Sequence, residues 1–441
     1  MFNREPLKLK STIRKLTSVA MESGTLAIGE GTARVCTMLI LVLVSRKFGV
    51  STLGSLALAQ TLGIYIALCI DAGSRHIGAK LVAAHPEGLQ IIQRRIQRKR
   101  LMLALLAIPL GLLYARFGPI PNNAKTLVSL YILFIAPYCL TLDWVLWGAK
   151  RYGSLSTSRA MVSALPLAAL VVALWFGADP RWAIPVSAGF GYAGSSAYTR
   201  WRCNRLFLSE TAAGTERFRE ITTQTDWGAI LVLGAALACN QAFNNIDSLM
   251  LGGLTNLQQV GLYSSAYRLL TALLGVYYLL TTTLYPRIAA ISPEKRNASR
   301  LKPYLVAAFL AGVVPALVIR HFSGWIIVAI YGQNFAKGAP MLSLLIMALP
   351  LDFVTSFCGI TMVAWGMSKR VLLATGTAAA VNISANLYLI PRYGGIGASW
   401  ATLVSYLVLL AILLFGLLGR RPDAKPASED ASLDERTAEC A

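Results

Sequence analysis

Twelve long apolar stretches dominate this sequence and limit what it can fold into. A helix needs about 20 largely apolar residues to cross the hydrocarbon core of a bilayer. Stretches of suitable length lie at 25–45, 52–72, 101–117, 126–147, 160–177, 183–199, 227–250, 260–284, 303–320, 338–364, 371–390 and 396–418. The sequence therefore predicts an all-α, polytopic membrane protein with about twelve transmembrane helices.

The composition agrees with this prediction and removes one competing class of function. Of the 441 residues, 56% are hydrophobic and 14% are charged, whereas soluble domains carry about 25% charged residues. A net charge of +21 would suit nucleic-acid binding in a soluble protein. The apolar stretches leave no soluble domain of useful size, so we expect membrane lipids and no nucleic acid among the partners.

The basic residues alternate between predicted loops and give the orientation. Excess Lys and Arg mark cytoplasmic loops. With the N-terminus in the cytoplasm, 31 of the 41 Lys and Arg residues fall in cytoplasmic segments and 8 fall on the opposite side. One missed or false span would disturb this alternation downstream of it. The charges thus predict that both termini face the cytoplasm.

The two halves of the chain are weakly similar. A shift of 207 residues places Gly54 on Gly261 and Ala59 on Ala266. Parallel repeats of this kind build alternating access in many transporters. We expect two six-helix lobes, at 23–226 and 227–418. A basic, interface-lying segment at 1–22 precedes them, and a disordered cytoplasmic tail at 419–441 follows.

Three ionisable residues interrupt the apolar spans in a way that suggests binding of an anion. Glu30 and Arg34 lie four residues apart, so they share one helix face and can form a structural pair. The alternative is that Arg34 lines a cavity. Arg268 is a second buried cation, in the opposite lobe. Guanidinium groups bind phosphate oxygens bidentately, so Arg34 and Arg268 together could clamp a diphosphate.

A second set of polar residues suggests ion coupling. Asp247 continues a polar stripe in the seventh span, Asn382 and Asn386 lie four apart in the eleventh, and Thr402 lies in the twelfth. Carboxylate, amide and hydroxyl oxygens suit a hard cation such as Na⁺. A hydrogen-bonded seam between helices is the alternative. Asp352, in the tenth span, is either a protonatable carboxylate or a partner for a helix end.

Motifs for catalysis and metal binding are missing from the sequence. There is no P-loop, no H-E-x-x-H and no G-x-S-x-G, so we expect neither ATP hydrolysis nor these hydrolase mechanisms. Five of the seven cysteines lie in apolar spans and none forms a C-x-x-C pair, which is typical of buried small hydrophobes. We therefore predict no catalytic residues and no structural metal.

Five stretches resemble the polysaccharide-repeat-unit (Wzx-like) flippases of the multidrug/oligosaccharidyl-lipid/polysaccharide exporter superfamily. The more specific ones are NNIDSLMLGGLTNLQQVGLYSSAYRL at 244–269, with its V-G-x-Y-x-x-A-x-R-L pattern, and YGQNFAKGAPMLSLL at 331–345. The others are SRKFGVSTLGSLALAQTLGIYIALCIDAGSRHIGAKLVA at 45–83, LYPRIAA at 284–290 and GGIGASWATLVSYLV at 394–408. The resemblance covers nearly the whole chain.

The resemblance implies a two-lobed carrier in the cell inner membrane. It would flip an undecaprenyl-diphosphate-linked oligosaccharide across that membrane for O-antigen, capsule or exopolysaccharide synthesis, beside a polysaccharide polymerase and a chain-length regulator. Related lipid II flippases have cavity-lining basic residues in helices 1 and 8, comparable with Arg34 and Arg268. They also bind Na⁺ through residues like Asp247, Asn382, Asn386 and Thr402, except that both residues of the eleventh span are amides here. The coupling ion is therefore Na⁺ or H⁺, with no other cofactor expected.

Two further classes of protein compete with this interpretation. A multidrug/cation antiporter of the same superfamily would export organic cations, which a lining of arginines disfavours. A membrane-embedded polysaccharide polymerase or ligase would need a long external loop bearing arginine and histidine, and the predicted external loops are short. We accordingly expect a flippase that resembles a secondary transporter, and not an enzyme.

Overall fold

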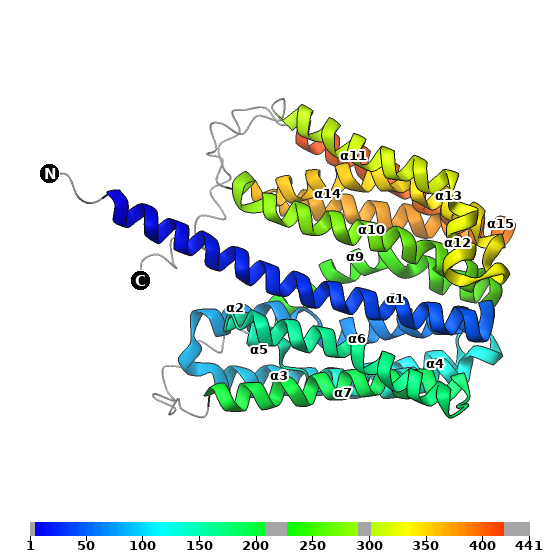
Figure 1. Ribbon diagram of the computed structural model, residues 1–441, viewed down its shortest axis with the longest axis horizontal. Helices are drawn as coiled ribbons and strands as arrows, with labels where there is room; N and C mark the ends of the chain where they lie inside the picture. Colours follow the sequence, from blue (N-terminus) through cyan, green and yellow to red (C-terminus); the bar gives the residue numbers. More distant parts are fainter. Residues whose placement is uncertain (1–4, 208–226, 290–300, 419–441) are drawn as a thin grey trace.

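The structure is a computed structural model that describes residues 5–207, 227–289 and 301–418. Within these ranges every regular element is helical (Figure 1). The first lobe contains α1 (Glu5–Asp71), α2 (Ser74–Ala84), α3 (Leu89–Phe117), α4 (Asn122–Phe134), α5 (Asp143–Gly148), α6 (Tyr152–Trp175) and α7 (Pro180–Phe207). The second contains α9 (Trp227–Leu254), α10 (Leu257–Ala289), α11 (Lys302–His321), α12 (Ser323–Tyr331), α13 (Ala339–Leu345), α14 (Leu349–Ala364) and α15 (Ser368–Leu418).

Seven helical segments of the described chain are long and apolar enough to cross a membrane. Two of them contain a non-helical glycine, Gly49 with φ 78° in α1 and Gly394 with φ 58° in α15. Residues other than glycine rarely adopt a positive φ. The two glycines therefore allow the chain to turn at these points. Each of these segments covers two of the predicted spans. Three more predicted spans correspond to α7, α9 and α10, which lie outside the seven, and the count of twelve stays a prediction.

The predicted fourth and tenth spans are interrupted at related positions. The fourth contains α4, a 3₁₀ turn at Ala136–Leu140 and α5. The tenth begins with a 3₁₀ turn at Gln333–Gly338 and is broken again at Ile346–Ala348, between α13 and α14. Shifting Ile346–Ala348 back by 207 residues places it at 139–141, at the end of the first break. One interruption in each half therefore occupies a related position, whereas Gln333–Gly338 shifts onto the unbroken part of α4.

The two lobes meet along α1. In Figure 1, α1 runs between a group formed by α2–α7 and a group formed by α9–α15, and it packs against α9 and α10. Two glycines permit this approach. A Cβ on Gly54 would collide with the carbonyl oxygen of Leu257, and a Cβ on Gly261 would collide with that of Val50. The two contacts exchange under the 207-residue shift, which is the expected relationship of two parallel repeats.

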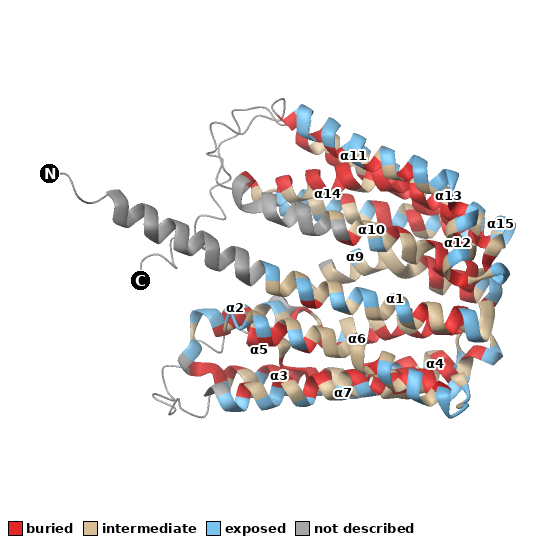
Figure 2. Cartoon of the chain, in the orientation of Figure 1, coloured by how far each residue is buried: buried red, intermediate tan, exposed pale blue. Residues whose placement is uncertain are grey.

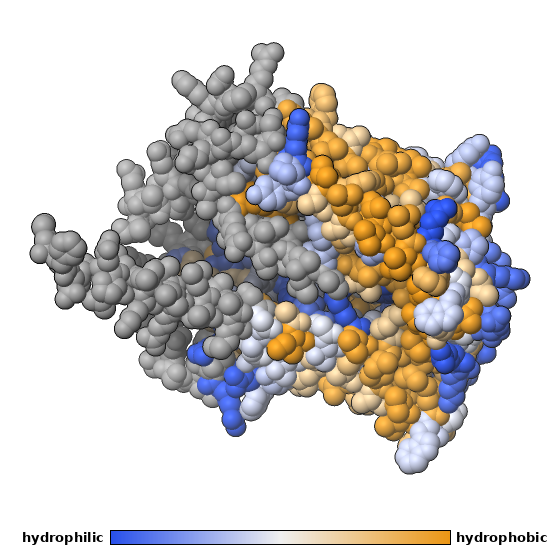
Figure 3. All heavy atoms as spheres, turned by 45° about the horizontal axis from the view of Figure 1, so that its top comes forward, coloured by the Kyte–Doolittle hydropathy of each residue, from blue (hydrophilic) through white to orange (hydrophobic). Residues whose placement is uncertain are grey.

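The outer faces of the lobes are apolar. Buried residues concentrate where helices meet inside each lobe (Figure 2), while large side chains such as Leu105, at 77% exposure, and Val314, at 65%, point outward. Figure 3 shows a broad hydrophobic area on the surface, bounded by hydrophilic residues at one end. Such a surface matches a lipid environment, and the chain is a multi-pass membrane protein.

Parts of the predicted organisation lie outside the described residues. These parts are the loop at 208–226, which we assigned to the first lobe, and the tail at 419–441. From Glu5 onward the predicted N-terminal segment is the beginning of α1. Its place at the interface and the orientation with both termini inside stay predictions.

Candidate functional site

Arg34 and Arg268 line one cavity between the lobes. Its volume is about 210 Å³, and its lining also includes Glu30, Thr37 and Thr271. The arginines come from α1 in the first lobe and α10 in the second. We call this cavity the cation pocket. The structure thus brings together the two cations that the sequence analysis paired across the lobes.

Local packing fixes where the two arginines lie. The guanidinium of Arg34 rests on Gly275 of α10, where a Cβ would collide with it. Gly275 follows Arg268 by seven residues, or two helical turns, so both lie on the face of α10 that meets α1. Arg268 itself donates from Nη2 to Oε1 of Gln60 at 2.5 Å. Neither Gly275 nor Gln60 is among the residues predicted from the sequence, although Gln60 is a polar residue inside an apolar span and could have been recognised from that.

Glu30 forms an ion pair with a different partner from the expected one. Its carboxylate accepts from the guanidinium of Arg159 on α6. The predicted pair with Arg34 is therefore wrong. Arg159 reaches Glu30 across the α1–α6 contact, while the side chain of Arg34 turns toward α10. As a result, Arg34 has no ion-pair partner among the described residues.

Asp247 is the centre of a buried hydrogen-bond cluster in the second lobe. Asn386 donates from Nδ2 to Asp247 Oδ1 at 2.6 Å, and Thr402 donates to Oδ2 at 2.9 Å. Asn386 also donates to Oδ1 of Asn382 at 2.9 Å. Three helix segments that are distant in the sequence supply these residues, and all of them are at most 4% exposed. The four residues that the sequence analysis grouped are thus assembled at one point.

Tyr263 of α10 is a member of this cluster that the sequence analysis missed. Its hydroxyl donates to Asp247 Oδ2 at 2.6 Å and lies 3.2 Å from the Thr402 hydroxyl. Tyr263 is the tyrosine of the V-G-x-Y pattern at 260–263. A tyrosine inside an apolar span is usually interpreted as part of the hydrophobic core. Only the V-G-x-Y motif could therefore have identified Tyr263 as a polar contact of Asp247. We call Asp247, Tyr263, Asn382, Asn386 and Thr402 the Asp247 cluster.

The donor set of the Asp247 cluster is suited to a hard monovalent cation. It offers carboxylate, amide and hydroxyl oxygens. Oδ1 of Asn386 and Nδ2 of Asn382 are buried and have no hydrogen-bond partner, so one carbonyl oxygen is free to coordinate. The described residues contain no group of three or more His, Cys, Asp or Glu side chains that could hold a metal. Only one formal negative charge is present, which argues against a divalent ion.

Asp352 occupies a separate position. It lies in the first turn of α14, and its carboxylate accepts from Ser356 of the same helix at 3.3 Å. None of the hydrogen bonds found among the described residues joins it to the Asp247 cluster. Asp352 makes no capping hydrogen bond to the end of α14, and its role as a protonatable carboxylate or as a partner for a helix end stays a prediction.

The first lobe holds a second polar cavity in which the charges are already paired. Its volume is about 360 Å³, and Glu30 and Arg159 line it together with Arg75 and Asp143. Arg75 and Asp143 form an ion pair at 2.7 Å, and Asp143 raises the pKa of Arg75. These compensated charges contrast with the cation pocket, where Arg34 faces the cavity without a carboxylate partner.

Comparisons with known proteins agree with this architecture. A family of proteins described as "Polysaccharide biosynthesis protein" matches residues 20–292. The fold is similar to that of the lipid II flippase MurJ in its inward closed conformation, with a TM-score of 0.70 and 14% identity over 89% of this chain and 87% of that one. It is also similar to an inward-facing multidrug resistance MATE family transporter of the MOP superfamily, with a TM-score of 0.64 and 16% identity over 89% and 95% of the two chains.

A third solved structure has the same fold with a lower score. It is a MOP superfamily transporter from Pyrococcus furiosus, described as having a binding pocket of reverse polarity, with a TM-score of 0.54 and 16% identity over 90% and 95% of the chains. Among curated protein sequences there is no significant match. The chain thus has the fold of a superfamily of transporters, not of enzymes.

Proposed function

The chain belongs to the polysaccharide biosynthesis protein family, and from that premise we propose that it flips an undecaprenyl-diphosphate-linked oligosaccharide across the inner membrane. The observation that carries the proposal is the cation pocket, where Arg34 and Arg268 from opposite lobes line one cavity. A carrier that alternates between two lobes needs contacts to its cargo from both of them.

The chemistry of the cation pocket supports a diphosphate as the recognised group. Two guanidinium groups provide forked donors that match phosphate oxygens. One carboxylate, Glu30, also lines the cavity, and it is engaged with Arg159. The net lining is therefore positive. A cationic drug would meet repulsion there, so we favour the flippase over a multidrug/cation antiporter with the same fold.

We propose that the Asp247 cluster couples this movement to an ion gradient. Na⁺ would be held by oxygen atoms of Asp247, Asn382, Asn386 and Thr402. The oxygen that Asn386 contributes is its Oδ1, which has no hydrogen-bond partner. Protonation of Asp247 by H⁺ is the alternative. Either ion would change the charge at a point where α9, α10 and α15 meet, and so would bias how these helices pack. We assign Asp352 no part in this site and keep it as a second protonatable group.

The biological setting follows from the same proposal. A flipped repeat unit would supply the polymerase and chain-length regulator that assemble O-antigen, capsule or exopolysaccharide. The family membership supports a polysaccharide pathway, and the cation pocket supports a lipid-linked diphosphate as the cargo.

Genetic complementation tests the proposal. The gene is expressed in a strain that lacks its own repeat-unit flippase, membrane levels are checked by immunoblot, and surface glycan is measured. We expect the wild type to restore surface glycan, and Arg34→Ala and Arg268→Ala to restore at most one tenth as much. Full restoration by both variants at equal membrane levels would refute the cation pocket as the binding site. Arg→Lys at each position separates bidentate recognition from simple charge.

A further inference from the structure

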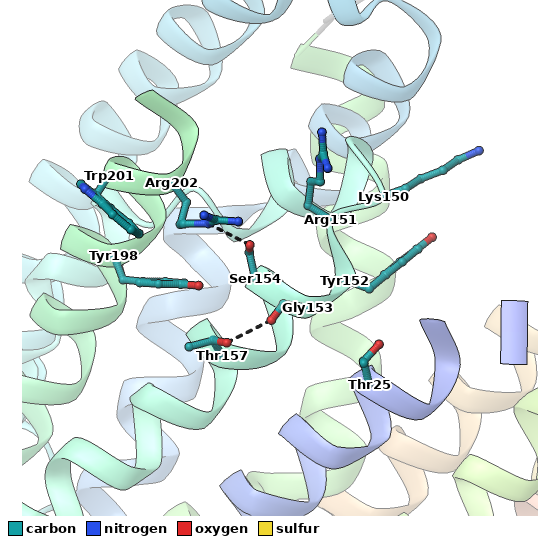
Figure 4. Close-up of a pocket in the computed structure, with 10 residues that line it drawn as sticks. All are labelled: Thr25, Lys150, Arg151, Tyr152, Gly153, Ser154, Thr157, Tyr198, Trp201 and Arg202. Carbon is teal, nitrogen blue, oxygen red and sulfur yellow. Dashed lines mark hydrogen bonds between the residues drawn. The ribbon is translucent and has the colours of Figure 1, made fainter. Parts of the chain in front are cut away.

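A third cavity, separate from the cation pocket, lies at the end of the first lobe that we predict to face the cytoplasm. Its volume is about 710 Å³. Figure 4 shows its two sides, with Tyr198, Trp201 and Arg202 of α7 on one and Lys150, Arg151 and Tyr152 at the start of α6 on the other. We call it the basic-aromatic pocket. None of these residues belongs to the cation pocket or to the Asp247 cluster.

No acidic side chain of the described residues lines this pocket or pairs with its cations. Lys150, Arg151 and Arg202 line it, and none of its lining residues is acidic. Arg202 donates from Nε to the Ser154 hydroxyl at 3.0 Å, which orients its guanidinium and leaves its other donors available. None of the ion pairs found among the described residues involves these three cations. The 360 Å³ cavity of the same lobe differs in this respect, because its arginines form ion pairs with Glu30 and Asp143.

Lys150 occupies a conformation that is costly for a side chain. Its φ is 55°, in the left-handed region, where a residue other than glycine or asparagine loses about 1 kcal/mol. The turn is held by bonds from Lys150 N to Trp147 O at 3.0 Å and from Arg151 N to Leu146 O at 2.8 Å. Glycine would fit this turn at lower cost. Lys150 therefore keeps a strained turn beside the pocket, and strained backbone is common at functional sites.

Aromatic rings provide the second kind of contact. Trp201 is 46% exposed, and its ring centroid lies 6.1 Å from that of Tyr198. The guanidinium groups of Arg205 and Arg202 lie 4.6 Å and 5.7 Å from the centroid of the Trp201 ring, so two cations are adjacent to this ring. Exposed aromatic faces bind the C–H faces of sugar rings, and guanidinium groups bind phosphate. Together they suit a ligand that carries both groups.

The position of the pocket relates it to the cation pocket. Thr25 of α1 lines the basic-aromatic pocket, and Arg34 lies nine residues further along the same helix. At 1.5 Å per residue the two sites are about 14 Å apart along α1. The Ser156 hydroxyl donates to the Thr25 carbonyl at 2.7 Å, which ties this part of α1 to α6. Both sites therefore lie along α1, and a ligand that leaves the basic-aromatic pocket along this helix reaches the cation pocket.

We propose that the basic-aromatic pocket is a binding site for a phosphorylated saccharide, and that it holds the diphosphate-sugar head of the cargo on the cytoplasmic side before the head reaches the cation pocket. The proposal rests on the proposed function for the identity of the cargo. The existence of the site rests on the residues at the pocket itself.

Direct binding tests this proposal. The protein with Arg34→Ala and Arg268→Ala, which lacks the cation pocket, is placed in neutral phosphatidylcholine nanodiscs and titrated with farnesyl-diphosphate-linked N-acetylglucosamine. We expect it still to bind this probe. Adding Lys150→Gly and Arg202→Ala should weaken binding at least tenfold, whereas adding Arg200→Ala should not. Arg200 is an exposed cation next to Trp201 that does not line the pocket. Lys150→Gly relieves the strained turn, so a loss of binding cannot come from misfolding at that position.

Three results would overturn the proposal. The first is that the Arg34→Ala, Arg268→Ala protein does not bind the probe. The second is that adding Lys150→Gly and Arg202→Ala leaves binding unchanged. The third is that phosphatidylglycerol displaces the probe at equal headgroup concentration. The last result would identify a phospholipid site. A failure of the proposed function is distinguishable, because in that case the wild type would not move the probe between leaflets, whatever the pocket variants bind. If the wild type flips the probe and the pocket variants bind it normally, only the present inference fails.

Discussion

The cation pocket and the Asp247 cluster both arise from ionisable residues within apolar spans, yet their surroundings differ. Three hydrogen-bond donors converge on Asp247, and the whole cluster is buried. Arg34 faces a cavity and rests on a glycine. A group with a complete set of internal partners contributes to the fold whether or not a ligand is present. A charge that faces a cavity without a partner is available to a ligand. The two sites should therefore respond differently to substitution.

The largest expected effect is that of Asp247→Ala. It removes the buried acceptor of Tyr263 and of one N–H of Asn386, at about 1–3 kcal/mol each, while Thr402 still donates to the carbonyl of Ala398. We expect complete loss of transport and a fall of roughly 3 kcal/mol or more in the free energy of unfolding. Thermal unfolding in detergent and surface-glycan complementation measure the two effects. If stability is unchanged, the cluster is not a structural element.

Asp247→Asn should separate the two roles of the cluster. It preserves the shape and two of the three acceptor contacts, so we expect a loss of about 1 kcal/mol in stability. Coupling should be lost, so that uptake driven by a Na⁺ or H⁺ gradient falls to the rate without a gradient. The measurement is transport into proteoliposomes with and without each gradient. Gradient-driven transport equal to that of the wild type would show that coupling lies elsewhere, with Asp352 as the next residue to substitute.

Gly275→Ala tests the cation pocket without removing a charge. The added Cβ would displace the guanidinium of Arg34. We expect transport to fall about tenfold, equivalent to about 1.4 kcal/mol, with little change in the unfolding temperature. Gly31→Ala is the matched control on α1, because a Cβ there meets nothing within 4 Å. Equal activity of the two variants would contradict the proposed position of Arg34.

The smallest expected effect is that of Tyr263→Phe. It removes one donor to Asp247 and keeps the ring stacked on Tyr267, whose centroid lies 5.7 Å away. We expect a loss of about 0.5–1.5 kcal/mol in stability and a weaker dependence of transport on the coupling ion. A titration of transport rate against ion concentration measures this shift. An unchanged midpoint would exclude Tyr263 from the coupling site.

The spacing of polar residues predicted which of them share a helix face, but it did not predict which other helix that face meets. Spacings of three and four, together with the family resemblance, were enough to group Asp247 with Asn382, Asn386 and Thr402. The Glu30–Arg34 pair was wrong because helix periodicity identifies which residues share a face and not which neighbouring helix that face meets. Arg159 was counted only as a loop charge, and its contact with Glu30 depends on the packing of α1 against α6.

The internal repeat was detectable in the sequence, but its physical meaning was not. Gly54 and Gly261 aligned under a shift of 207 residues, and the structure adds that each approaches a carbonyl oxygen of the other lobe. No sequence pattern predicted the basic-aromatic pocket. Its residues come from the beginning of α6, from the last turns of α7 and from the strained turn at Lys150, which are distant in the sequence. Tertiary contacts between distant segments cannot be read from local patterns.

The most direct test of the central claim is flipping in a defined system. Purified wild type and the Arg34→Ala, Arg268→Ala variant are reconstituted in proteoliposomes with a fluorescent undecaprenyl-diphosphate-linked oligosaccharide, and its appearance in the opposite leaflet is followed by quenching. Loss of two charge-assisted contacts of about 1.5–3 kcal/mol each predicts flipping at least 100-fold slower in the variant. Flipping by the variant at the wild-type rate would contradict the claim that the cation pocket binds the diphosphate.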